Sequence, residues 1–194
     1  MKNGSCEIIK SYFFKSLILT STEDDSLYEM IGKRVKRLLY RATRDGFKVS
    51  AFHSRCDGKA NTITIIKNNL NYVFGGYASS AWHSNNATNS DSNAFIISLR
   101  RAGISKLEKY KVTTISEALT GYSTQGPTFG AVTESAVQIN EDSNIKIGSH
   151  TNFCEYYECP LGYSPDTVNE ATKSYLAGNY NNWLATEIEV YQLE

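Results

Sequence analysis

Two runs in which apolar and polar side chains alternate constrain the fold of this chain most. The first, Thr62–Lys67, places Ile63 and Ile65 on one face of an extended strand. The second, Asn71–Tyr77, carries aromatic residues at alternate positions, and only a short polar link separates the two runs. Because so short a link can join only antiparallel strands, we expect a hairpin whose two strands are each half-buried.

The same alternation predicts further strands along the chain: Leu38–Ala42, Phe95–Leu99, Tyr110–Thr114, Ala136–Ile139 and Leu184–Tyr191. In the last strand we expect Leu184, Thr186, Ile188 and Val190 to face inward and Glu187, Glu189 and Tyr191 to face the other way. A strand of this kind should lie inside a sheet. Segments rich in Asn, Ser and Gly predict exposed loops at His83–Ser92 and Ser116–Gly130.

Helices are expected in two places. Thr22–Asp25 has the form of a capping box, and apolar residues follow it at helical spacing, so we predict a helix over Asp24–Lys36. The basic run at its end is either a protein-docking patch or, as we favour, a solvated helix end. The Asp45-Gly46 turn should precede a short helix over Phe47–Ser54.

Many strands, few helices and no regular strand–helix alternation indicate a mostly β (α+β) fold. We expect an antiparallel two-sheet β-sandwich with a few flanking helices. A chain of 194 residues is long enough to form one domain with a substantial core. We assign residues 1–15 to an N-terminal extension and residues 16–194 to this domain.

The charge balance bears on the partners that the chain can take. Basic and acidic residues both number 20, and this zero formal net charge argues against a nucleic-acid partner. No stretch is apolar for long enough to span a membrane, and the N-terminus lacks the apolar core of a signal peptide. We therefore expect a cytoplasmic protein with no direct membrane insertion.

The expected compartment decides whether the cysteines are free or paired. In a reducing cytosol we expect Cys6, Cys56, Cys154 and Cys159 to be free thiols, although Cys154 and Cys159 could pair under oxidative stress. His150 together with Cys154 and Cys159 is spaced loosely like a set of zinc ligands. A structural zinc site needs four ligands at tighter spacing, so we expect no metal and no cofactor.

His53 and Cys56 are the candidates for thiol chemistry, because three-residue spacing on a helix places them on one face. A cysteine nucleophile needs a lowered pKa, a base and a third group that orients the base. Asp57 is adjacent in sequence, but we expect its side chain to point elsewhere. We favour a packed thiol over a catalytic one.

Three carboxylates are the other candidates for chemistry. Glu187 and Glu189 share a strand face, so a paired-carboxylate site is conceivable. We favour a structural role, in which Asp45 caps its turn and Glu189 accepts hydrogen bonds from the backbone or from Arg41 or Arg44.

Glycines mark two further positions. Gly75-Gly76 lacks the lysine and the strand–loop–helix context of a phosphate loop, and predicts a bulge or a close approach to another segment. The run from Gly126 to Gly130 predicts a shaped loop.

Several motifs, in a fixed order, resemble the TLDc domain, the oxidation-resistance module of eukaryotic proteins. They are Leu38–Phe47 (Leu-Leu-Tyr-Arg-Ala-Thr-Arg-Asp-Gly-Phe), Ala51–Lys59, Asn71–Tyr77, Asn93–Leu99, Gly126–Gly130, Tyr175–Gly178 and Glu187–Tyr191. We take the following as positions of structural or interaction importance in the family pattern: Arg44, Asp45, Gly46, Gly75, Gly76, Gly126, Gly130, Glu187 and Glu189. The chain departs from that pattern after Gly130, where Ala131–Ile139 keeps the strand but lacks the family's glycines.

The resemblance implies a β-sandwich without an agreed catalytic residue. It further implies a non-catalytic role in oxidative-stress resistance, exerted by binding the soluble sector of the vacuolar proton-pumping ATPase (V-ATPase) and regulating the pump. The exposed loops Ser84–Ser92 and Ser116–Gly126 and the chain termini are the expected contact surfaces. The alternatives are an enzyme, either a thiol-dependent antioxidant using Cys56 or a carboxylate hydrolase, and a scaffold module without pump binding.

Overall fold

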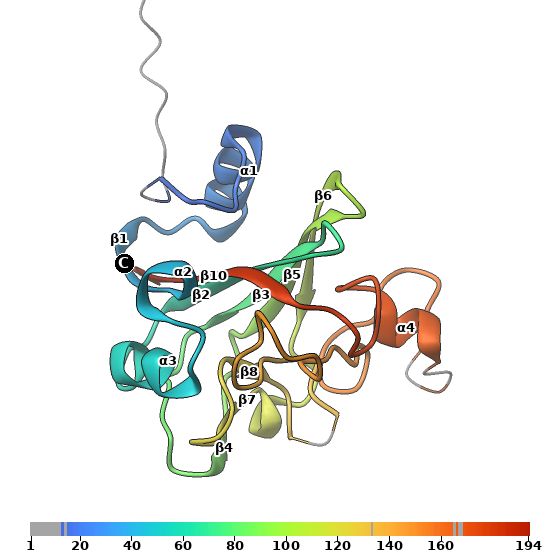
Figure 1. The fold of residues 1–194 in the computed structure, drawn as a ribbon. Helices are drawn as coiled ribbons and strands as arrows, with labels where there is room; N and C mark the ends of the chain where they lie inside the picture. Colours follow the sequence, from blue (N-terminus) through green and yellow to red (C-terminus); the bar gives the residue numbers. More distant parts are fainter. Residues whose placement is uncertain (1–12, 14, 133, 165, 167–168) are drawn as a thin grey trace, which may run out of the picture.

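The computed structural model describes residues 13, 15–132, 134–164, 166 and 169–194, which form two packed antiparallel sheets with short helices around them (Figure 1). The larger sheet has the strand order β1-β10-β2-β3-β5-β6. Its strands are β1 (Val35–Arg41), β10 (Ala185–Leu193), β2 (Thr62–Asn68), β3 (Val73–Ala78), β5 (Phe95–Arg101) and β6 (Ile104–Lys111). The smaller sheet has the order β4-β7-β8-β9, from β4 (Ala87–Asn89), β7 (Leu119–Gly121), β8 (Thr128–Phe129) and β9 (Val137–Gln138). The predicted two-sheet architecture is therefore confirmed.

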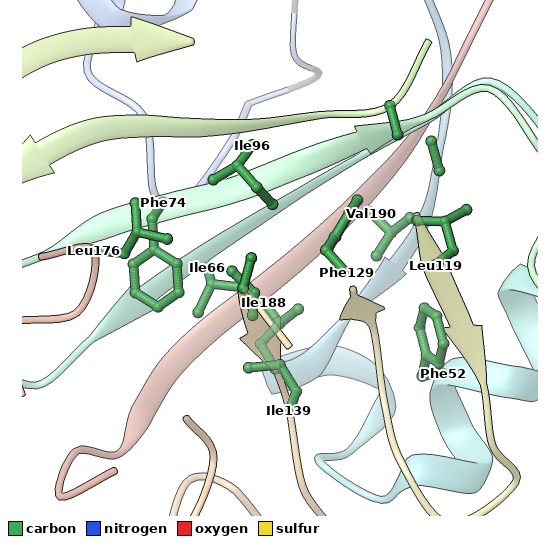
Figure 2. Close-up of a cluster of buried hydrophobic side chains, with 14 of the residues drawn as sticks. Phe52, Ile66, Phe74, Ile96, Leu119, Phe129, Ile139, Leu176, Ile188 and Val190 are labelled. Carbon is green, nitrogen blue, oxygen red and sulfur yellow. The ribbon is translucent and has the colours of Figure 1, made fainter. Parts of the chain in front are cut away.

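The main core lies between the two sheets (Figure 2). Ile66, Phe74 and Ile188 of the larger sheet share this cluster with Leu119 and Phe129 of the smaller one. A second cluster covers the opposite face of the larger sheet, where α1 (Ser21–Ile31) and the segment before it pack on β2, β3, β5 and β10. The four central strands of the larger sheet are thus buried on both faces.

The predicted hairpin is formed by β2 and β3, with Ile65 opposite Gly75 in antiparallel register. The expectation that each strand is only half-buried is wrong, because every residue of β3 is buried. The reason is the second core cluster, which covers the face that would otherwise meet solvent. Alternation in a sequence marks two faces but does not reveal what covers each of them.

The last strand, β10, lies inside the larger sheet between β1 and β2, as predicted. Its expected alternation is wrong at the start, because a register shift lies between Ala185 and Glu187. This irregularity leaves Thr186 exposed and turns Ala185 into the core instead. Glu189 and Tyr191 do face the other way, but they too are buried.

The first helix differs from its prediction at both ends. Its capping box joins Thr20 and Glu23 rather than residues 22–25, and the helix ends at Gly32, whose φ of 65° is left-handed. The basic run expected at the helix end instead occupies the link and β1. Glu23 is buried and pairs with Arg100 of β5, so the helix is tied to the sheet through a charged pair. Burial alone would raise the pKa of Glu23, but the hydrogen bonds from Arg100, Thr20 and Ser105 lower it.

Both segments expected to be loops contain short regular elements. The segment 83–92 holds β4, and the segment 116–130 holds part of η1 (Ile115–Glu117), β7 and β8. Strands of two or three residues are too short to show a periodic pattern, and they exist here only through pairing with one another. The remaining helices are α2 (Ala42–Asp45), α3 (Val49–Cys56) and α4 (Glu170–Ser174).

Candidate functional site

The acidic residues of the family motifs lie where β1, β10 and α2 join, each with its own hydrogen-bond donors. Glu189 is fully buried and accepts hydrogen bonds from Arg41 Nε at 2.9 Å, from the Leu17 backbone N–H at 2.9 Å and from the Tyr191 hydroxyl at 2.9 Å. The Ser16 hydroxyl donates to the same carboxylate at 2.5 Å. The prediction that Glu189 accepts backbone and arginine hydrogen bonds is confirmed, with Arg41 as the arginine. This carboxylate therefore anchors the segment before α1 to the sheet.

Asp45 caps its turn, as predicted. Its carboxylate accepts a hydrogen bond from the Arg41 backbone N–H at 2.9 Å and pairs with both Arg44 and Arg55 at 2.7 and 2.9 Å. Burial would raise the pKa of Asp45, but these donors and positive charges outweigh it and hold the pKa below its ordinary value. Gly46 follows in the left-handed region with φ 96°, which explains why a glycine is needed there.

The Glu187 carboxylate has different hydrogen-bond donors from that of Glu189. It accepts hydrogen bonds from the backbone N–H and the hydroxyl of Thr43, the second residue of α2, and from the Ile188 backbone N–H. Each carboxylate thus has its own donors within the chain, and the structure does not bring the two together as an acid–base pair. The role of Thr43 was not predicted, because a lone threonine in a motif carries no signal of its partner.

Close approach explains the glycine positions. A Cβ on Gly75 would lie 1.9 Å from the Thr64 carbonyl oxygen, and one on Gly76 would lie 2.7 Å from the Phe129 ring. Gly126 sits against the Ile139 backbone, and Gly130 adopts a φ of 97°. Of the two readings left open for Gly75-Gly76, close approach to another segment therefore holds, with Gly75 against the backbone of β2 and Gly76 against the Phe129 side chain of β8.

The structure brings His53 and Cys56 onto one helix but not into a reactive pair. Cys56 is completely buried, and burial raises the pKa of its thiol well above the ordinary range. His53 lies instead within hydrogen-bonding distance of Asp57 (2.9 Å) and of the Tyr122 and Gln125 carbonyl oxygens (3.1 and 2.9 Å). The expectation that Asp57 points elsewhere is wrong, since it caps α3 and its side chain lies one helical turn beyond His53. His53 thus fixes the loop after β7 rather than activating a thiol.

The burial of Cys56 predicts that its thiol reacts slowly. We expect iodoacetamide at neutral pH to alkylate Cys56 in the folded chain at least about a hundredfold more slowly than in the urea-unfolded chain. Peptide mapping by mass spectrometry would measure the rate at Cys56 alone. Equal rates in the folded and unfolded chains would contradict the burial.

Cys154 and Cys159 are joined in a disulfide, with their Cα atoms 4.6 Å apart, so the expectation of free thiols is wrong for this pair. Their closeness in sequence brings the two side chains within bonding reach, and neither remains a thiolate for a metal. His150 instead lies 3.1 Å from the Ser135 hydroxyl, and burial lowers the pKa of its imidazole. Among the residues that the structure describes, no group of three or more His, Cys, Asp and Glu could hold a metal ion. Cys6 lies outside the described residues.

The Cys154–Cys159 disulfide gives a second prediction, about stability. Closing a loop with a sequence separation of 5 should stabilise the oxidised chain by about 2 kcal/mol through loss of entropy in the unfolded state. We expect the double variant Cys154→Ser/Cys159→Ser to lose that amount in urea unfolding under oxidising conditions. The difference from wild type should vanish when both proteins are unfolded in a reducing agent. Equal midpoints under oxidising conditions would contradict the prediction.

No helix within the described ranges is long and apolar enough to cross a bilayer. A recess of about 580 Å³ opens beside the end of α1, and three lysines line it. The sequence did not predict this recess. Lys109 and Lys111 are two residues apart in β6 and therefore share a face, which was the only signal in the sequence. Lys33 lies far away along the chain, in the link between α1 and β1, and carried no such signal.

Fold and polar contacts together define a β-sandwich domain whose buried carboxylates are hydrogen-bonded within its own scaffold. A sequence model of the TLDc domain family matches residues 4–194. The chain therefore belongs to the TLDc domain family, which is associated with oxidation resistance. The match begins before Ser16, and Phe13, within the range assigned to an extension, is fully buried against Tyr191. No curated protein matches the chain significantly.

Proposed function

We propose that this TLDc domain acts by binding rather than by catalysis. The observation that supports this most is the state of its reactive groups. The thiol of Cys56 has no exposed surface, and the carboxylates of Asp45, Glu187 and Glu189 are occupied by donors of the chain itself. A nucleophile or acid–base pair needs access to a substrate, which these groups lack. No observation favours the thiol-dependent enzyme or the hydrolase.

The partner that we propose is the soluble sector of the V-ATPase, met in the cytoplasm. The proposal rests on the resemblance to a family whose members bind that pump. A domain that binds the assembled and disassembled pump with different affinity shifts the balance between these states without any turnover of its own. Oxidative-stress resistance would then follow from control of the pump.

The geometry supports one contact surface made from both of the predicted loops. β4 within the first loop pairs with β7 within the second, with Thr88 opposite Thr120. Asn86 also accepts a hydrogen bond from the Ser123 backbone N–H at 3.1 Å. β4 is an edge strand, with no neighbour on its outer side among the described strands. Unpaired edges of this kind accept a strand from another chain.

The test mixes the purified chain with intact V-ATPase and follows co-migration on a sizing column together with ATP hydrolysis. Thr88→Arg places a bulky charge in the first of these loops, and Ile115→Arg places one directly before the second, where Ile115 is 49% exposed. We expect each to weaken binding about tenfold or more, because a partner would have to bury an unpaired charge. Ile104→Arg is the matched control, since Ile104 is 73% exposed at the far end of β6.

The outcomes separate the hypotheses. Binding with altered hydrolysis or subunit release supports a pump regulator. If all three variants bind as tightly as wild type, the contact surface lies elsewhere on the domain. No binding to an active pump would overturn the partner and favour a scaffold role, and peroxide consumption equal in wild type and Cys56→Ser would reject the thiol enzyme.

A further inference from the structure

The outer face of the larger sheet is only partly covered by α1. Where this helix ends, Ile31 forms one wall of the recess of about 580 Å³. Lys33, in the link between α1 and β1, lines it together with Lys109 and Lys111 of β6. We call this hollow the lysine recess. Its volume falls in the range of pockets that bind small molecules.

The floor of the lysine recess is a fixed cross-strand row. Tyr77 of β3 is opposite Phe95 of β5, and Phe95 is opposite Lys111 of β6. The two rings stack with centroids 5.0 Å apart, and Lys109 Nζ lies 4.0 Å above the Phe95 ring. The Tyr77 hydroxyl donates to Asn61 Oδ1 at 2.8 Å, which fixes a polar group at one end. Lys109 and Lys111 therefore project from a strand of the sheet, whereas Lys33 comes from the link between α1 and β1.

Positive charge in the lysine recess is not balanced locally. None of the three lysines has an ion pair with any residue in the described part of the chain, although Lys36, Lys48, Lys106 and Lys146 all do. The described side chains that line the recess include no carboxylate.

Two acids lie close by, and both are already engaged. Asp91 is buried and accepts hydrogen bonds from the Ser79, Ser80 and Asn93 backbone N–H groups. Glu158 accepts from the Lys111 backbone N–H. A chain of zero formal net charge thus gathers around one hollow three lysines that form no ion pair with the described residues.

We propose that the lysine recess binds the phosphate groups of a small polyanion, either free in solution or on a lipid headgroup. Three separate ammonium groups suit several tetrahedral phosphate oxygens, whereas a planar carboxylate is matched better by the fork of an arginine. Asn61, Ser79, Ser92 and Asn93 add neutral polar groups at the same hollow. This site goes beyond the proposed function, because it lies on the outer sheet face and does not depend on a pump contact.

The test uses inorganic tripolyphosphate and isothermal titration calorimetry on the full chain. We expect saturable binding to wild type and a loss of at least about tenfold in affinity in the triple variant Lys33→Ala/Lys109→Ala/Lys111→Ala. Lys106→Ala is the matched control, because Lys106 lies on the same strand but pairs with Glu108 outside the recess. Unchanged urea midpoints would show that the variants are folded.

A second variant tests shape apart from charge. Asn93→Trp should fill the hollow and weaken binding while every lysine is kept. Absence of saturable binding to wild type would overturn the proposal. So would equal losses in the triple variant and in Lys106→Ala, since that result indicates a diffuse charge effect.

Vesicles distinguish the two sources of phosphate. Phosphatidylcholine vesicles with and without phosphatidic acid would be sedimented with each variant. Retention that needs phosphatidic acid and the three lysines assigns the recess to a lipid headgroup. Binding of tripolyphosphate without retention on vesicles assigns it to a free ligand.

Discussion

Replacement of Glu189 by alanine is expected to lower the free energy of unfolding by about 3 to 5 kcal/mol. The carboxylate is fully buried and pairs with Arg41 at 2.7 Å, so its removal leaves an arginine and several donors without their acceptor. The same change frees Ser16 and Leu17 from β10. Urea unfolding followed by tryptophan fluorescence would measure the loss.

A matched control lies at the end of the same pair of strands. Lys36 and Glu194 form an ion pair whose side chains are 54% and 57% exposed. Because water screens such a pair, Glu194→Ala should cost no more than about 1 kcal/mol. Similar losses in the two variants would show that Glu189 has no special structural role. The double variant Arg41→Met/Glu189→Leu should recover part of the stability, since it removes both charges together.

Gly75→Ala is expected to destabilise the domain by about 3 kcal/mol or more, or to prevent folding. The new methyl group would meet the Thr64 carbonyl oxygen at 1.9 Å, and this oxygen belongs to the neighbouring strand β2. Backbone inside a six-stranded sheet cannot move aside without disturbing its own hydrogen bonds. An unstrained glycine-to-alanine change would instead stabilise slightly through the unfolded chain.

Gly76 offers the contrast needed to interpret that result. A methyl group there would meet the Phe129 ring at 2.7 Å, which is a side chain and not backbone. Adding Phe129→Leu to Gly76→Ala should therefore recover part of the lost stability. Gly75→Ala should gain nothing from Phe129→Leu. Circular dichroism with urea melts would measure all four variants, and equal rescue of both glycine variants would contradict the assigned contacts.

Some regular strands were predictable because their alternating patterns are long enough to identify, but β6 (Ile104–Lys111) was not, since the strand expected over Tyr110–Thr114 overlaps only its end. The hairpin of β2 and β3, the strand β5 and the central place of β10 all follow from side-chain alternation. The smaller sheet was not predictable to the same extent. Its strands have two or three residues, so pairing between distant segments creates them and local sequence does not. The end of α1 did carry a signal, since Gly32 is a common helix stop, but the basic run beyond it suggested a longer helix.

The internal polar contacts were partly predictable for a similar reason. Asp45 caps a turn beside it in sequence, and Glu189 had only a few arginines as plausible partners. The pairing of Glu23 with Arg100 and the gathering of Lys33 with Lys109 depend on how α1 packs on the sheet. Tertiary packing of that kind leaves no trace in local spacing.

The position of β10 also governs the order in which the domain can be built. Among the described strands β1 pairs only with β10, so that Val35 is opposite Leu193. A ribosome releases β1 early and β10 last among the described strands, and until then β1 has no strand to join. The emerging chain must therefore hold a nearly complete but open sheet, with one edge of β2 uncovered. Chaperone binding during synthesis should concentrate on this edge and end abruptly once β10 inserts.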